Sequence, residues 1–141
     1  MHSPLPPLLA GLVGKRPESI SFSGASDWWL TFADDMSLYM PSLWRITKSG
    51  SLYASSEDHG QVFGLAEPYD ARVPLRMLVG CSLLGVELSS ETTDLSLRFA
   101  KQLVLQVLTT SLGYEGWSIV VSGRHRLVAR GNELLHLTGD A

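Results

Sequence analysis

The chain has 141 residues, a formal net charge of -3, 45% hydrophobic residues and 18% charged residues. This length suits one domain with a substantial core, and the composition is that of an ordinary globular protein rather than a disordered chain. No excess of positive charge is present to attract nucleic acid or an anionic membrane surface. Cys81 is the one cysteine, which excludes an internal disulfide framework and favours a reducing compartment.

The chain also lacks the marks of membrane insertion or export. No apolar run approaches the roughly 18 residues needed to span a bilayer. The first 14 residues are mildly apolar, but they carry prolines and no basic region, which disfavours a secretory signal. We therefore expect a cytoplasmic protein made of one domain, residues 1–141, with no membrane partner and no nucleic-acid partner.

The first half of the chain predicts a strand, a hairpin and a further strand. The strand is Ser19–Phe22, and the hairpin is Asp27–Met40 with a short polar turn at Ala33-Asp34-Asp35. Leu43–Ile46 reads as the next strand. Successive side chains of a strand point to opposite faces, so one face of the hairpin collects its apolar residues. These are Trp28, Leu30, Phe32, Leu38 and Met40.

The middle of the chain, residues 55–75, reads as an irregular connector because it contains Gly60, Gly64, Pro68 and Pro74. A short helix is expected at Val73–Val79, with Pro74 near its start.

The second half repeats this order. Leu83–Leu88 is a strand, Asp94–Val107 is a hairpin, and Trp117–Val121 is the strand after it. The chain then predicts a hairpin of Arg126–Ala129 and Leu134–Leu137, joined by a Gly131-Asn132 turn of the kind that hairpins favour.

An internal repeat connects the two halves. Asp94–Val107 aligns without a gap with Asp27–Met40 at an offset of 67 residues. We infer repeat units at 8–54 and 76–131, joined by the connector. The predicted fold class is mainly β: two pseudo-symmetric antiparallel β units forming a barrel or a sandwich, with one or two short helices. The predicted core contains Leu30, Phe32, Trp44, Leu97, Phe99, Leu105 and Trp117.

Residues that could carry chemistry are scattered. His2, His59, His125 and His136 do not have the spacing of zinc ligands. His59 follows Glu57-Asp58, a pattern equally typical of a solvated loop. We predict no catalytic residues, no metal and no cofactor.

Two further positions have both a chemical and a structural interpretation. Cys81 is a nucleophile if a histidine lies beside it, and otherwise a small buried side chain. Asp34-Asp35 could bind a hard cation, but paired aspartates are also common in turns.

Aromatic residues opposite the predicted core point to a partner. Trp29 and Tyr39 lie on that face, where the second repeat has Ser96 and Gln106, and both residue types are favoured at interfaces. Val104 and Leu108 also point away from the core. The alternatives are an interface, with a symmetric homodimer or another protein, and a second buried layer.

A basic cluster, Arg124-His125-Arg126, lies near the end of the chain and could grip an acidic partner surface. Alternatively, it protects a hairpin edge by charge. The predicted partner-binding residues are therefore Trp29, Tyr39, Arg124 and Arg126.

The string Tyr114-Glu115-Gly116-Trp117, taken with D-L-S-L-R-F and K-Q-L-V-L-Q-V before it, resembles a family of small bacterial proteins of uncharacterised function. Their pattern is an aspartate-led strand L-x-L-x-F, a second strand L-x-V, and Tyr-Glu-x-Trp ahead of a third. The resemblance covers residues 78–131 well and the first repeat loosely. Members often accompany toxin or secretion genes, which implies an immunity-like binding protein. The resemblance brings no catalytic residues with it.

We therefore expect a non-catalytic protein-binding module whose partner is another protein or a second copy. The alternative is a protein that binds a small ligand or performs metal-assisted hydrolysis.

Overall fold

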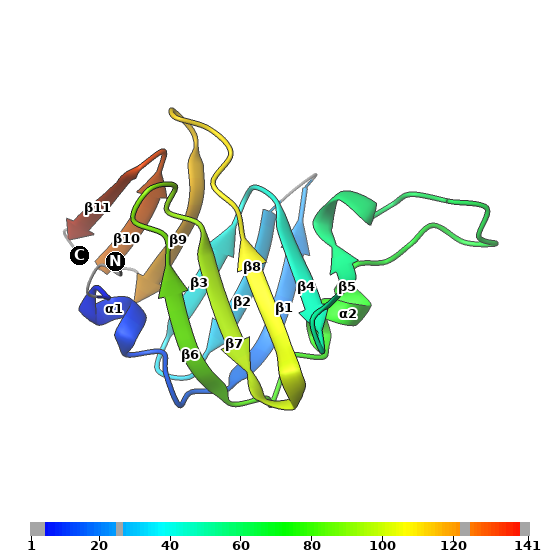
Figure 1. Ribbon diagram of the computed structural model, residues 1–141, viewed down its shortest axis with the longest axis horizontal. Helices are drawn as coiled ribbons and strands as arrows, with labels where there is room; N and C mark the ends of the chain where they lie inside the picture. Colours follow the sequence, from blue (N-terminus) through cyan, green and yellow to red (C-terminus); the bar gives the residue numbers. More distant parts are fainter. Residues whose placement is uncertain (1–4, 25–26, 122–124, 139–141) are drawn as a thin grey trace.

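The computed structural model describes residues 5–24, 27–121 and 125–138, which form two antiparallel β-sheets packed face to face (Figure 1). The prediction of a mainly β fold with short helices is confirmed. Of the two expected architectures, the sandwich is found, since the sheets do not close into a barrel. One sheet has six strands, in the order β1-β2-β3-β9-β10-β11, and the other has five, in the order β5-β4-β8-β7-β6.

The helix expected at Val73–Val79 is found at Arg72–Arg76, and the strands follow the predicted segments, except that β5 was not predicted. Their bounds are β1 Pro17–Ser23, β2 Asp27–Phe32, β3 Met36–Met40, β4 Trp44–Lys48, β5 Ser51–Ser55, β6 Leu83–Leu88, β7 Leu95–Phe99, β8 Leu103–Val107, β9 Glu115–Val121, β10 His125–Arg130 and β11 Glu133–Thr138.

The two halves of the chain are interlocked through these sheets. Strands β1–β3 form a three-stranded meander in one sheet, and β6–β8 form the equivalent meander in the other. The strand after each meander crosses to the opposite sheet. Thus β9 pairs with β3, with Ile119 opposite Leu38, and β4 pairs with β8, with Ile46 opposite Leu105. Each sheet therefore needs strands from both halves.

The core fills the space between the sheets. Alternation along each strand sends every second side chain inward, as the burial patterns of β2, β3 and β8 show. The core prediction is confirmed, since each of these side chains is at most 1% exposed: Leu30, Phe32, Trp44, Leu97, Phe99, Leu105 and Trp117.

Two short helices lie at the open sides of the sandwich (Figure 1). Helix α1, Pro7–Ala10, precedes β1, and α2, Arg72–Arg76, precedes β6 and contacts both β1 and β5. Matching hydrogen bonds fasten the segment after each helix: Gly14 N–H donates to Leu83 O at 2.8 Å, and Gly80 N–H donates to Pro17 O at 2.9 Å. None of the helices in the described part of the chain is long and apolar enough to cross a membrane.

Candidate functional site

The outer face of the six-stranded sheet carries a row of side chains that lie directly opposite one another on successive strands. We call it the Trp29 row. It consists of Ser21, Trp29, Tyr39, Ser118, Val128 and Leu135. Ser118 and Val128 are buried, at 0% and 8% exposure, whereas Trp29, Tyr39 and Leu135 are half-buried, so part of the apolar surface of these three reaches solvent.

The outer face of the five-stranded sheet has the equivalent row, which we call the Arg45 row. It consists of Ser55, Arg45, Gln106, Ser96 and Glu87. Ser96 occupies the place equivalent to that of Trp29, and Gln106 the place equivalent to that of Tyr39. The equivalent places in the five-stranded sheet are therefore polar, whereas Trp29 and Tyr39 make those of the six-stranded sheet aromatic.

Trp29 and Tyr39 hold each other in place. Their rings stack with centroids 4.5 Å apart and planes 30° apart, an offset aromatic arrangement that is favourable beyond its buried area. The Tyr39 hydroxyl donates a hydrogen bond to Asp27 Oδ1 at 2.6 Å. The pair is therefore a rigid aromatic surface that needs little ordering when something binds to it.

A charged pair flanks the aromatic residues. Arg126 Nη2 donates to Glu115 Oε1 at 2.7 Å, and both charges act electrostatically on Tyr39. Burial, followed by the hydrogen bond to Asp27, raises the pKa of Tyr39 to about 12. The phenol is therefore neutral at physiological pH and remains a hydrogen-bond donor.

Tyr39 offers a test of this geometry. Its phenol should ionise near pH 12, above the value of 10.0 for an unperturbed tyrosine, and Asp27→Asn should lower that pKa. Since the folded pKa is the higher one, this stabilisation should be complete below pH 10 and lost as the pH rises toward 12. Tyrosinate absorbance during alkaline titration measures the ionisation, and Tyr39→Phe assigns it. Ionisation unchanged by Asp27→Asn would contradict the Asp27 contact.

The structure brings most of the predicted partner-binding residues together. Trp29, Tyr39 and Arg126 share one outer face, and Arg124 lies outside the described residues. Val104 and Leu108 belong to the five-stranded sheet side, so the apolar residues opposite the core form two separate surfaces.

The residues considered for catalysis are not brought together. Cys81 is buried, with its Sγ donating to Met77 O at 3.4 Å. Asp34 pairs with Lys15 Nζ at 2.7 Å, and this hydrogen bond holds the pKa of Asp34 below its ordinary value. Asp34 and Asp35 have φ angles of 63° and 57°, a conformation that aspartate tolerates in turns. Within the described ranges, no three histidine, cysteine or acidic side chains form a metal-binding group.

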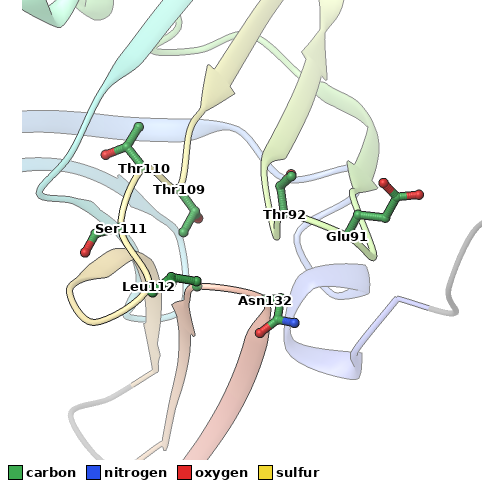
Figure 2. Close-up of a pocket in the computed structure, with 8 residues that line it drawn as sticks. Glu91, Thr92, Thr109, Thr110, Ser111, Leu112 and Asn132 are labelled. Atoms are coloured by element: carbon green, nitrogen blue, oxygen red, sulfur yellow. The ribbon is translucent and has the colours of Figure 1, made fainter.

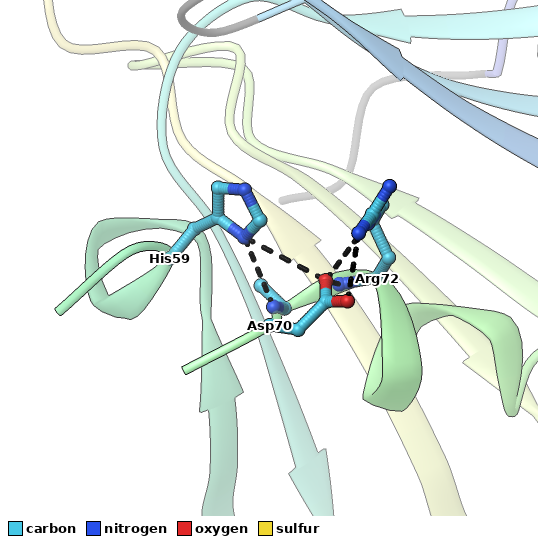
Figure 3. Close-up of polar contacts among 4 residues, drawn as sticks. His59, Asp70 and Arg72 are labelled. Carbon is cyan, nitrogen blue, oxygen red and sulfur yellow. Dashed lines mark hydrogen bonds and ion pairs between the residues drawn. The ribbon is translucent and has the colours of Figure 1, made fainter. Parts of the chain in front are cut away.

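His59 has a different environment from the solvated loop that its sequence suggested. Its ring packs edge-on against Phe22 and Trp28, with centroids 4.7 and 5.1 Å away. Nδ1 accepts the Ala71 N–H at 3.1 Å, and Asp70, next to Ala71, forms two hydrogen bonds with the Arg72 side chain (Figure 3). These contacts make His59 an anchor between the connector and the core.

A depression of about 330 Å³ lies where three turns meet at one end of the sandwich (Figure 2). Hydroxyl and amide groups could hold a neutral polar molecule there, which gives the small-ligand alternative a location. The one ionisable side chain in the lining is Glu91, so the depression lacks an acid–base pair for hydrolysis. The lining consists of Glu91, Thr92, Thr109, Thr110, Ser111, Leu112, Gly131 and Asn132.

Comparison of the chain with protein-family models, with curated proteins and with solved structures finds no match in any of the three. The strongest candidate site is therefore the one that geometry supports best, the outer face around Trp29 and Tyr39.

Proposed function

We propose that this chain is a non-catalytic protein-binding module whose partner docks on the outer face of the six-stranded sheet. The observation that carries the proposal is the contrast between the Trp29 row and the Arg45 row. The two equivalent places hold Trp29 and Tyr39 on the outer face of the six-stranded sheet, and Ser96 and Gln106 on the outer face of the five-stranded sheet. Binding would explain an aromatic pair that remains partly exposed and whose equivalent places in the other sheet are polar.

The chemistry of the face favours a protein as its occupant. The face is built from the strands of a sheet, and it combines a tryptophan, a tyrosine and an arginine, the residue types that dominate binding energy in protein interfaces. The Arg126–Glu115 pair offers both signs of charge at its side, which suits the mixed polar rim of a protein interface. A nucleic acid would require an excess of positive charge that the chain lacks.

The resemblance of residues 78–131 to small bacterial proteins found beside toxin or secretion genes suggests the type of partner. An immunity-like protein in the cytoplasm, where a lone cysteine stays reduced, would bind and block a toxin through such a face. The proposal therefore names a cognate toxin or secreted protein as the occupant, rather than a second copy of this chain.

A double variant tests the docking face. Trp29→Ser with Tyr39→Gln copies the residues that the Arg45 row carries at the same places. We expect this variant to fold but to melt at a lower temperature than wild type, because the ring stack and the Tyr39–Asp27 hydrogen bond are lost, so binding is compared well below that temperature. Its affinity for the partner should fall at least about tenfold, the loss expected when one interface anchor worth ~1.4 kcal/mol is removed.

The matched control is Leu84→Ser, which removes an apolar side chain of 49% exposure from β6 in the other sheet. Tagged wild type, double variant and control are expressed in the native host, and the proteins that each retains are compared quantitatively. The proposal is supported if one protein is retained by wild type and by Leu84→Ser and is not retained by the folded double variant. Equal retention by all three would refute the proposal, and so would a wild-type dimer that the double variant converts to monomer.

A further inference from the structure

The connector carries an apolar loop that the rest of the molecule does not cover. Residues 61–68 are all exposed, and Val62, Phe63 and Leu65 supply apolar side chains, with Phe63 at 68% exposure. In Figure 1 this loop projects away from the sandwich beside β5. We call residues 61–68 the arm.

The arm has a defined shape. At its base, Gly60 N–H donates to Tyr69 O at 2.8 Å, and Tyr69 N–H donates to Gln61 O at 2.7 Å. At its tip, Leu65 N–H donates to Val62 O at 2.7 Å, which closes a tight turn. Phe63 has a φ angle of 47°, a strained conformation for a non-glycine residue. Backbone strain of this kind is concentrated at functional sites. The strained residue here is the exposed Phe63.

The base of the arm is fastened to the sandwich. His59, immediately before it, packs on Phe22 and Trp28 and accepts the Ala71 N–H (Figure 3). The hydrogen bonds from Arg72 hold the pKa of Asp70 below its ordinary value, so Asp70 stays ionised and paired. The chain thus anchors both ends of the arm while leaving its apolar tip in solvent.

The arm and the segment before it are acidic. Residues 56–69 contain Glu57, Asp58 and Glu67, and no lysine or arginine. A surface that receives the arm should therefore combine an apolar centre with positive charge.

The outer face of the five-stranded sheet has this combination beside the Arg45 row. A second row, the Val104 row, consists of Leu52, Thr47, Val104, Arg98 and Gly85. Leu52 is 67% exposed, and Val104 and Arg98 line a depression of about 290 Å³. A Cβ at Gly85 would lie 2.7 Å from Arg98 Nη2, so the glycine lets this guanidinium lie close to the sheet.

Two lysines lie near one end of the Val104 row. Lys48 ends β4 and lies over the Tyr53 ring, 5.5 Å from its centroid. Lys101 lies in the turn between β7 and β8, and Ser49, next to Lys48, bonds to Gln102 in that turn. Lys48 lies opposite the core-facing Leu103, so Arg98 is the cation of the row itself, and Glu87 lines the same depression.

We propose that two copies of this chain exchange their arms, each arm lying on the Val104 row of the other copy. The arm leaves the sandwich beside β5, the edge strand that carries Leu52. A two-fold rotation axis next to β5 therefore brings each arm onto strands β5, β4 and β8 of the other copy. The two contacts are identical, and the assembly closes as a dimer. The outer face of the six-stranded sheet remains free, so this inference goes beyond the proposed function and is independent of it.

Light scattering and sedimentation of the purified full chain test the exchange. Wild type should be a dimer that weakens as salt rises, because exposed opposite charges are screened. Phe63→Ser should weaken the dimer at least about tenfold, the effect of losing one small anchor on each side. The matched control, Leu112→Ser, removes an apolar side chain of 87% exposure from another loop and should leave the dimer unchanged.

Charge exchange gives a sharper test. Glu67→Lys and Arg98→Glu should each weaken the dimer, because both contacts then bring like charges together. A one-to-one mixture of the two variants should dimerise again. In the mixed pair, the lysine introduced into one copy faces the glutamate introduced into the other, while the native Glu67 and Arg98 face each other in the second contact.

Three outcomes would overturn the exchange. The first is a wild-type chain that remains monomeric up to about 1 mM, where even weak specific contacts are populated. The second is a dimer that Phe63→Ser leaves intact. The third is a mixture of Glu67→Lys and Arg98→Glu that associates no better than either variant alone.

Discussion

Replacing Phe99 with alanine is expected to lower the free energy of unfolding by about 3–5 kcal/mol, which is a large part of the stability of an ordinary domain. Phe99 is 1% exposed and lies in the core between the sheets. Truncation removes its apolar surface from the core and leaves a cavity that β-sheets cannot readily collapse to fill. Denaturant unfolding followed by tryptophan fluorescence measures the loss.

The equivalent place in the other meander provides a matched comparison. Phe32 is also 1% exposed, so Phe32→Ala should cost a similar amount. Tyr114→Ala, at a side chain 82% exposed, should change stability by no more than about 0.5 kcal/mol. A Phe99→Ala protein with the wild-type unfolding midpoint would show that this face of β7 is not the core.

Strand faces and core residues could be predicted because alternation is a local property. Trp28, Leu30 and Phe32 are spaced two residues apart, and a strand with that spacing can bury only one of its faces. The same reasoning placed Leu97 and Phe99 correctly. The Gly131-Asn132 turn fixed the last hairpin, and Gly131 has the positive φ of 60° that such a turn requires.

The exchange of strands between the sheets could not be predicted in this way. The pairings of β3 with β9 and of β4 with β8 join residues far apart in sequence, and an inward-facing Ile46 or Ile119 suits either sheet equally well. The strand after each meander crosses to the opposite sheet. Side chains that the sequence assigned to one common face therefore lie on two separate faces. Trp29 and Val104 thus lie on opposite outer faces.

The candidate site was partly visible in the sequence. Setting Trp29 and Tyr39 against Ser96 and Gln106 identified an unexplained aromatic pair. The rest of the row required the register across β9, β10 and β11, which no local pattern supplies. The contacts of His59 with Phe22 and Trp28 could not be predicted for the same reason, because they depend on how the connector returns to the sandwich.

Gly116→Ala is the second substitution with a large expected effect, a loss of about 1–3 kcal/mol from overpacking. Gly116 is buried at the start of β9, and a Cβ there would lie 2.9 Å from Thr109 Cβ and 3.0 Å from Thr109 Cα. Thr109 cannot simply turn away, because its hydroxyl is bonded to Thr93 Oγ1 at 2.9 Å. The Trp117 Nε1–H also donates to Thr93 O at 2.8 Å, so displacing Thr109 disturbs the packing of a fully buried tryptophan.

Gly113, in the loop that precedes β9, separates this crowding from the general effect of replacing a glycine. A Cβ at Gly113 meets nothing within 4 Å. Gly113→Ala should therefore be neutral or stabilise the fold by up to about 1 kcal/mol, because alanine restricts the unfolded chain. Thermal unfolding of the two variants compares them directly, and near-ultraviolet circular dichroism reports on the packing of Trp117. Equal stability of Gly116→Ala and Gly113→Ala, with an unchanged tryptophan signal, would show that Thr109 does not close over Gly116.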